Sequence, residues 1–318
     1  MGLFMTQPAS RAFMGASDLH LIVEFARRAA GLRWPSSTYK KVGDVVWSMY
    51  SSQQSDQIRL WFDGGDLVAY ASVDPPMSAE FDIIPGLGWY DRVGDEILGW
   101  AEDCLRGLPS TGNETIPKAF AMLGYAKISL TMALDSDQHR LFLLKRHGYA
   151  RTKGFDVLYR RGLQDRTSVP KLESSLRLRH ATDADLEARV DVHRDAWSVW
   201  GPSAATVENY RRLRNAPIYD PELDVVLEDA DGRFLTYCIG WLDFANRFGH
   251  FEPVGCRPAF TGKGYARAVT IEAMRRMQER GMHTALVATA SVNERARRLY
   301  PSCGFVEVDR AYHYVKNL

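Results

Sequence analysis

The chain has 318 residues, of which 46% are hydrophobic and 25% charged, an ordinary composition for a globular protein of about two domains. Lysine and arginine number 40, and aspartate and glutamate 39. The resulting formal net charge of +1 excludes a strongly basic nucleic-acid-binding surface. No apolar run reaches the about 18 residues that a membrane helix needs, so we expect no membrane association. The four cysteines form no CxxC pair, so we expect no metal site, no disulfide framework and a cytoplasmic location.

After a flexible N-terminal tail over residues 1–15, the first half of the chain predicts a series of helices and strands that ends at residue 162. The expected elements, in chain order, are a helix over 17–28, strands over 58–62, 67–73 and 81–84, a helix over 95–105, a strand over 128–134, a helix over 137–146 and a strand over 155–159. The polar stretch 163–175 follows and contains Pro170, which is typical of a linker.

The second half, residues 176–318, predicts a similar series. The expected elements are a strand over 176–179, a helix over 182–197 capped by Thr182, strands over 223–228, 236–243 and 249–256, a helix over 264–280, a strand over 284–288, a helix over 293–303 and a strand over 306–315. Short polar turns such as 229–232 favour antiparallel hairpins over an all-parallel sheet.

The two halves share a fixed spacing near their ends. Asn293 and Gly304 follow Asp137 and Gly148 by the same 156 positions, and an aromatic residue comes after each glycine. We interpret this spacing as a divergent duplication of one α/β unit. The expected fold is therefore two tandem α+β domains, over residues 16–162 and 176–318, each a mostly antiparallel mixed sheet flanked by helices.

The segment with the clearest chemistry joins the strand over 249–256 to the long helix that follows. Its two glycines allow a tight turn and a close approach of backbone to a ligand. Unpaired amides and the helix dipole at a helix start favour a phosphate or pyrophosphate. The loop matches neither the Walker pattern nor the dinucleotide pattern, and by itself it fits a plain strand-to-helix turn equally well. Its residues are Thr261, Gly262, Lys263, Gly264, Tyr265 and Ala266.

Two motifs in order give this segment a family resemblance. Residues 261–266 resemble motif A of the GNAT superfamily of N-acetyltransferases, in which the pattern Q/R-x-x-G-x-G/A follows a strand. Residues 293–305 resemble motif B, with Asn293, Ala296, Tyr300 and then Gly-Phe. One departure is Thr261, where the family usually has Arg or Gln. We expect Lys263 to supply part of the missing charge.

The resemblance implies a fold, a cofactor and a set of roles. It implies acetyl-CoA as the acyl donor, a longer acyl group remaining open, and no metal. Strand backbone would hold the pantetheine arm, the glycine loop would hold the pyrophosphate, and Tyr300 would protonate the departing CoA sulfur. The implied cofactor-binding residues are Val254, Gly255, Cys256, Thr261, Gly262, Lys263, Gly264, Tyr265, Ala266, Asn293 and Ala296.

The chemistry of amine acylation asks for a base as well as an acid, because only a neutral amine attacks a thioester. Glu252 lies on the strand just before the cofactor edge and is the candidate base; the alternative is a surface or paired carboxylate. For Tyr300 the alternative to the acid role is a packed aromatic ring. Cys256 lacks an adjacent histidine, which disfavours a covalent intermediate.

The first half keeps the resemblance only in outline. At the same offset, Asp137, Arg140 and Leu144 stand where the second half has Asn293, Ala296 and Tyr300, and no glycine loop of the same pattern follows residues 81–84. We therefore predict a degenerate GNAT-like domain that shapes structure or substrate.

The predicted function is transfer of an acetyl group from acetyl-CoA to an amine of a small molecule by direct attack. Two alternatives remain open: a non-catalytic acyl-CoA-binding sensor or partner module, and a protein-modifying acetyltransferase. The acceptor and the oligomeric state are not predicted. Aromatic residues suited to the acceptor pocket, with a place in the core as the alternative, are Trp197, Trp200, Trp241 and Phe244.

Overall fold

The computed structural model describes residues 8–35, 37–51, 57–107, 127–164 and 168–318. The first half of the chain contains, in order, β1 (Ala9–Ala12), α1 (Ala16–Arg33), α2 (Val42–Ser51), β2 (Ile58–Asp63), β3 (Asp66–Asp74), β4 (Ser78–Ile83), α3 (Tyr90–Gly107), β5 (Ile128–Leu134), α5 (Gln138–Arg146) and β6 (Ala150–Gly162). Among the described residues, no helix is both long and apolar enough to span a membrane.

The second half follows the same plan. It contains β7 (Arg177–His180), α6 (Leu186–Trp197), α7 (Val207–Arg214), β8 (Asp224–Glu228), β9 (Phe234–Asp243), β10 (Phe248–Cys256), α8 (Tyr265–Glu279), β11 (Thr284–Ala290), α9 (Glu294–Ser302) and β12 (Val306–Asn317). Short 3₁₀ turns precede α6 (Asp183–Asp185), follow it (Ser198–Trp200), precede β8 (Pro221–Leu223) and follow β10 (Pro258–Phe260).

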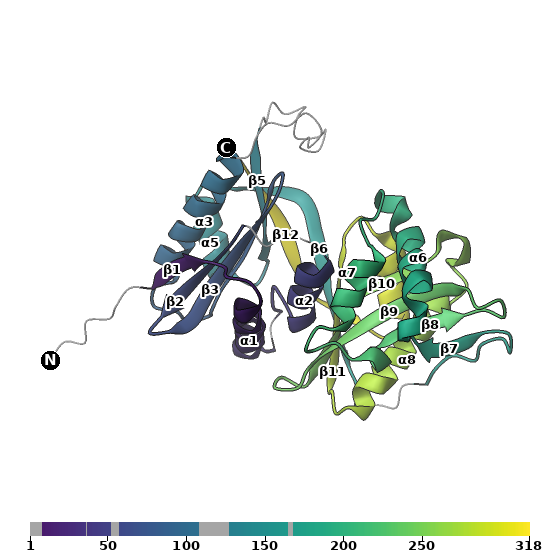
Figure 1. Cartoon of the computed structure of the whole chain (residues 1–318). Helices are drawn as coiled ribbons and strands as arrows, with labels where there is room; N and C mark the ends of the chain where they lie inside the picture. Colours follow the sequence, from purple (N-terminus) through teal and green to yellow (C-terminus); the bar gives the residue numbers. More distant parts are fainter. Residues whose placement is uncertain (1–7, 36, 52–56, 108–126, 165–167) are drawn as a thin grey trace.

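The strands of both halves join in one mixed sheet, in the order β1-β2-β3-β4-β5-β12-β6-β11-β10-β9-β8-β7 (Figure 1). Among the strand pairs of the described residues, β4–β5 and β10–β11 are parallel and the others are antiparallel. The predicted mixed α/β fold is confirmed. The order β1 to β5 then β12 mirrors the order β7 to β11 then β6, as a duplication requires.

Each half contributes its last strand to the other half. β12 lies between β5 and β6, and β6 pairs with β11, with Val287 opposite Tyr159. Val157 and Tyr159 of β6 are buried in the core of the second half. The two predicted domains, 16–162 and 176–318, therefore exchange their last strands, which the sequence analysis did not predict. The alternation of apolar and polar residues shows that one face of a strand is buried. It does not show which of the two cores covers that face.

The predicted tail over residues 1–15 is also corrected. Ala9–Ala12 pairs with β2, and Arg11 forms an ion pair with Asp18 at 2.6 Å at the start of α1. Residues 1–7 lie outside the described residues, as do 165–167 of the predicted linker. The remainder of the linker carries no regular structure, although Leu163 is buried and its amide donates to the carbonyl of His283.

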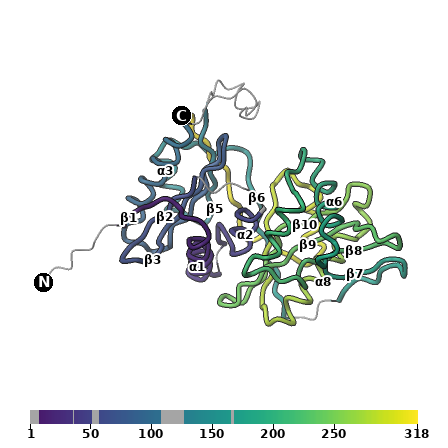
Figure 2. The backbone as a smooth tube through the Cα atoms, in the orientation of Figure 1, coloured from purple at the N-terminus to yellow at the C-terminus, as the bar shows by residue number. Residues whose placement is uncertain are grey.

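Helix α2, which the sequence analysis did not predict, joins the two halves (Figure 2). Its Val42, Val45 and Val46 are buried in a core that also contains Trp241 of β9. A Cβ on Gly43 would lie 2.1 Å from the Trp241 indole, so only glycine lets the helix lie this close to β9. Helix α2 of the first half therefore packs directly on β9 and β10 of the second half.

Candidate active site

The site forms where two parallel strands separate. β10 and β11 pair only from Phe248 to His250, and the register of β10 against β9 shifts between Phe251 and Val254. Beyond His250 the edge of β10 that faces β11 has no strand partner, so its backbone groups are open to a ligand. A cavity of about 1170 Å³ occupies this gap.

The cavity gathers nearly all of the residues that the sequence motifs single out. Those lining it are Glu252, Val254, Gly255, Cys256, Thr261, Gly262, Gly264, Tyr265, Ala266, Asn293, Ala296 and Tyr300. Lys263 does not line it; its ammonium lies 5.2 Å from the centre of the Phe260 ring instead. The cavity has other cations that the sequence analysis did not propose, Arg267, Arg295 and Arg298.

The glycine loop has the geometry of an anion cradle. Gly262 and Gly264 have φ values of 80° and 81°, in the left-handed region that favours glycine. Gly264 is the N-cap of α8 and supplies no side-chain cap, so the first amides of that helix stay available to a ligand. The hydroxyl of Thr261 donates to the carbonyl of Pro258 at 2.9 Å, so it holds the preceding turn. These features fit a pyrophosphate.

Replacing Gly264 by valine is expected to weaken CoA binding by at least about tenfold. A Cβ at Gly264 would meet no atom within 4 Å, so the branched side chain would enter the space where the phosphate fits. Calorimetric titration with CoA measures the change. Gly281→Val is the matched control, because Gly281 also has a φ of 80° and open surroundings but lies at the opposite end of α8. Equal CoA affinity in both folded variants would place the cofactor elsewhere.

Asn293 and Tyr300 come from α9 on the other side of the gap. The Asn293 side chain caps this helix by accepting from the amide of Ala296 at 3.2 Å. Tyr300 is 5% exposed and packs between the rings of Tyr159 and Phe305. Its hydroxyl makes no hydrogen bond to any residue in the described part of the chain. Burial, followed by the nearby Glu252, raises the Tyr300 pKa above its usual value, so the phenol stays protonated.

Glu252 lies in the same cavity, close to charges from the first half of the chain. Burial raises its pKa to about 7; Asp44 acts in the same direction, while Lys41 and Lys40 oppose the rise. Asp44 of α2 also lies 3.4 Å from the ring of His250, two positions before Glu252 on β10. The carboxylate thus has a pKa suited to proton transfer near neutral pH. The sequence analysis missed Lys41 and Asp44, although Val42, Val45 and Val46 have the spacing of an amphipathic helix.

Asp44→Asn is expected to move the acid limb of the pH–rate profile to lower pH. The Asp44 carboxylate disfavours the charged form of Glu252, and its loss also leaves the Lys41 ammonium without its partner at 3.2 Å. Both changes lower the Glu252 pKa, so the Glu252 carboxylate stays ionised at lower pH. Rates measured from pH 5 to 9 test this, with Asp74→Asn on the distant β3 as a control. An acid limb that stays in place or moves upward would contradict it.

Two of the four aromatic residues that the sequence analysis proposed for the acceptor pocket line the cavity. Trp197 and Trp200, at the end of α6 and in the turn after it, line the cavity and are partly exposed. Trp241 instead belongs to the core, where its indole donates to the carbonyl of Glu252 at 2.6 Å. Phe244 is exposed and lies outside the cavity. Of the four aromatic candidates, the structure therefore places two at the cavity.

The equivalent gap in the first half is filled by protein. Strands β4 and β5 pair at Ser78 and Leu130 and then separate, as β10 and β11 do in the second half. The buried guanidinium of Arg140 crosses the opening, donating to the carbonyl of Phe81 at 2.8 Å and to the Thr131 hydroxyl at 3.4 Å. The Tyr39 ring lies 4.1 Å from that guanidinium. In the second half Ala296 occupies the position of Arg140, and its small side chain leaves the gap open.

The local cap geometry is the same in both halves. Asp137 caps α5 by accepting from the amide of Arg140 at 3.1 Å, as Asn293 caps α9. Gly148 and Gly304 then end their helices with φ values of 78° and 83°. The 156-residue offset therefore relates structurally equivalent positions. The space for a ligand is lost in the first half because larger side chains fill it, while the backbone geometry of the caps is kept.

Comparison with known proteins agrees with this geometry. The family model of the acetyltransferase (GNAT) family matches residues 189–305. A mycothiol acetyltransferase of Streptomyces coelicolor is 26% identical over 266 residues, 80% of this chain and 78% of that protein. A mycothiol acetyltransferase of Saccharomonospora viridis is 25% identical over 186 residues, 55% of this chain and 60% of that protein. The latter match spans less than two thirds of its relative.

Two solved structures share the whole fold. A GCN5-related N-acetyltransferase from Sphaerobacter thermophilus superposes with a TM-score of 0.63 at 19% identity, covering 97% of this chain and 95% of that one. A tandem GNAT protein from the clavulanic acid biosynthesis pathway superposes with a TM-score of 0.64 at 13% identity, covering 98% of both chains. The fold is therefore that of a protein with two GNAT domains in tandem. Residues 189–305 match the acetyltransferase (GNAT) family, and the chain as a whole resembles tandem GNAT proteins in its fold.

Proposed function

We propose that this protein transfers an acetyl group from acetyl-CoA to an amine of a small molecule, in the second half of the chain. The observation that carries the proposal is the single cavity between β10 and β11. It is lined by the left-handed glycine loop, by Glu252 with a pKa of about 7, and by the protonated phenol of Tyr300. An anion cradle, a base and an acid are the parts that acyl transfer needs.

The reaction follows from these positions. Glu252 takes the proton from the incoming ammonium, and the neutral nitrogen attacks the thioester carbonyl carbon. The unpaired edge of β10 past His250 offers backbone amides to the negative charge that grows on the carbonyl oxygen. The carbon–sulfur bond then breaks, and the Tyr300 hydroxyl gives its proton to the sulfur. The former amine nitrogen loses its second proton to water, from which the Tyr300 phenolate is reprotonated, and Glu252 releases its proton to solvent. The products are an N-acetylated amine and free CoA thiol.

The experiment is release of CoA thiol from acetyl-CoA with a panel of small primary amines and a lysine-containing peptide. We expect amine-dependent release with small amines and an equal amount of acetylated product. Faster reaction with the peptide would identify a protein acceptor. Binding of acetyl-CoA without release for any amine would favour a sensor. Gly264→Val is the negative control.

The first half is proposed to bind no CoA, because Arg140 and Tyr39 fill its gap. Titration of the full chain with CoA is therefore expected to give one site, and Gly264→Val is expected to weaken that site by at least about tenfold. Calorimetry measures the number of sites and their affinity. Two equivalent sites, or a site that keeps wild-type affinity in Gly264→Val, would contradict a degenerate first domain.

A further inference from the structure

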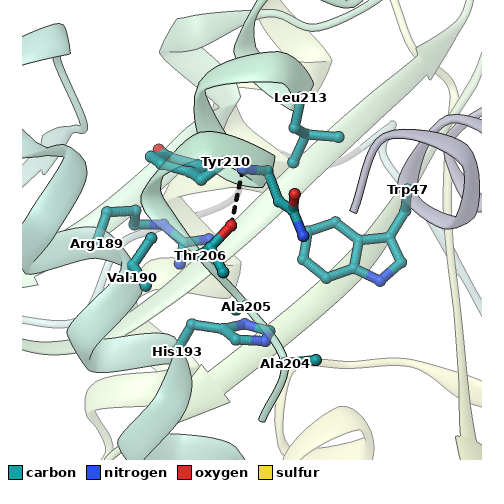
Figure 3. A pocket seen from close by; sticks show the side chains of 10 residues that line it. Trp47, Arg189, Val190, His193, Ala204, Ala205, Thr206, Tyr210 and Leu213 are labelled. Atoms are coloured by element: carbon teal, nitrogen blue, oxygen red, sulfur yellow. Dashed lines mark hydrogen bonds between the residues drawn. The ribbon is translucent and has the colours of Figure 1, made fainter. Parts of the chain in front are cut away.

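A second, smaller pocket lies between the two halves of the chain. Its volume is about 140 Å³, close to the roughly 150 Å³ of cavities that hold a benzene ring. Figure 3 shows Trp47 of α2 facing Tyr210 and Thr206 across it, with Leu213 towards one end and His193 towards the other. The remaining lining residues are Arg189, Val190, Ala204, Ala205 and Asn209. The size and the aromatic walls suit one planar ring.

The polar groups of this pocket favour an oxygen-bearing ligand. Among the described residues that line it, Arg189 is the charged side chain, and the buried Asp224 carboxylate behind it balances this charge. Burial, helped by Arg189, lowers the pKa of His193 to about 3, so this ring is neutral at physiological pH. The pocket therefore offers an unused donor, which suits an oxygen acceptor and which an ammonium group cannot satisfy.

Arg189 has hydrogen-bonding capacity to spare. It is 2% exposed, and its Nε donates to Asp224 at 2.8 Å. That carboxylate also accepts from the hydroxyls of Tyr210 and Tyr219. The Nη2 atom of Arg189 is buried with no hydrogen-bond partner among the described residues. A buried guanidinium nitrogen without a partner is costly, and an oxygen of a bound ligand would satisfy it.

The pocket adjoins the catalytic cavity along α6. Arg189, His193 and Trp197 follow one another at four-residue intervals, so they share one face of the helix and span about 12 Å. The rings of His193 and Trp197 stack with centroids 5.8 Å apart, and both residues bond to the Tyr237 hydroxyl. Trp197 lines the large cavity, while His193 lines the small pocket. The two sites are therefore about three helical turns or less apart along one face of α6, with the His193 and Trp197 rings at their boundary.

We propose that the pocket between α2, α6 and α7 binds an aromatic ring that carries a hydrogen-bond-accepting oxygen, and that this ring is the distal part of the acceptor. The assignment of the ring to the acceptor rests on the proposed acetyl transfer, whereas the binding of the ring in the pocket does not. The pocket would then select acceptors by the group remote from the amine, and α2 would make the first half of the chain part of that selection.

Calorimetry with benzoate and benzylamine on the full chain tests the binding. The two probes share a ring and differ in charge. We expect one benzoate per chain, with benzylamine at least about tenfold weaker. Ala204→Leu should weaken benzoate binding by at least about tenfold, because the larger side chain would occupy the pocket from an exposed position. Ala204→Ser should retain benzoate binding, because the serine side chain is nearly as small as alanine. Ala205→Leu should also weaken benzoate binding, because it fills the same pocket from the neighbouring residue.

Three results would overturn the binding site: no benzoate binding, equal binding of benzylamine, or equal benzoate binding in the wild type and both filling variants. CoA affinity should stay unchanged in Ala204→Leu, because this residue does not line the large cavity.

Inhibition kinetics test the link to the acceptor. Benzoate should compete with the amine and not with acetyl-CoA in the thiol-release assay. Benzoate that binds without competing with the amine would overturn the acceptor role and leave the pocket itself supported. If no amine is acetylated, the proposed function fails, while calorimetry still decides whether the pocket binds the probe.

Discussion

Tyr300→Phe is expected to lower kcat by about 10²–10⁴-fold, the usual range for loss of a general acid, while CoA affinity stays near that of the wild type. The substitution keeps the ring that packs against Tyr159 and Phe305 and removes only the hydroxyl. Because that hydroxyl bonds to no described residue, thermal stability should change little. The thiolate would then leave without a proton donor, so the loss should appear in the chemical step.

Single-turnover rates at saturating acetyl-CoA measure this effect. Tyr159→Phe is the matched control, since Tyr159 contacts the same ring from β6 but does not line the catalytic cavity. Its kcat should stay within a few-fold of the wild type. If Tyr300→Phe kept a near-normal rate with chemistry shown to be rate-limiting, the acid role would have to be given up.

Glu252→Gln is expected to give the second large loss, again within about 10²–10⁴-fold. Glu252 accepts a proton only when ionised, and its pKa is about 7, so wild-type kcat/KM should fall as the pH drops below about 7. The variant should lose most near and above pH 7, where wild-type Glu252 is ionised, and the two rates should converge at lower pH. Its profile should lack the limb near pH 7 and follow only the ionisation of the amine.

The control is Glu294→Gln, because Glu294 lines the same cavity from α9 but is exposed and pairs with Arg298. It should leave the profile in place. An alternative account lets the amine lose its proton to bulk water before it binds. In that case Glu252→Gln would leave the pH–rate profile unchanged, and Glu252 would not be the base.

The parts of the site that could be predicted from the sequence are those fixed by local backbone chemistry. Gly264 begins α8 in the left-handed region, and Asn293 caps α9, because a glycine and an asparagine at these positions determine the turn and the cap within a few residues. The spacing between Gly264 and Asn293, with one helix and one strand between them, then predicted that both residues lie at the same gap between strands. The same logic identified the matching cap at Asp137.

The remainder depends on contacts between residues that are far apart in the sequence. The exchange of β6 and β12 is set by which core buries each strand, and strand periodicity is the same in either place. The influence of Asp44 on Glu252 requires α2 to pack on β10, a contact between the two halves. The filling of the first gap had a sequence signal, Arg140 at the position of Ala296, but its hydrogen bonds to both separated strands appear only in the structure.

The structure of the full chain crystallised with CoA tests the central claim most directly. We predict one CoA per chain, with its pyrophosphate on the amides of residues 262–266, its pantetheine arm along the free edge of β10 and its sulfur near the Tyr300 hydroxyl. CoA bound between β4 and β5, or bound in the second half with its sulfur away from Tyr300 and Glu252, would contradict this account.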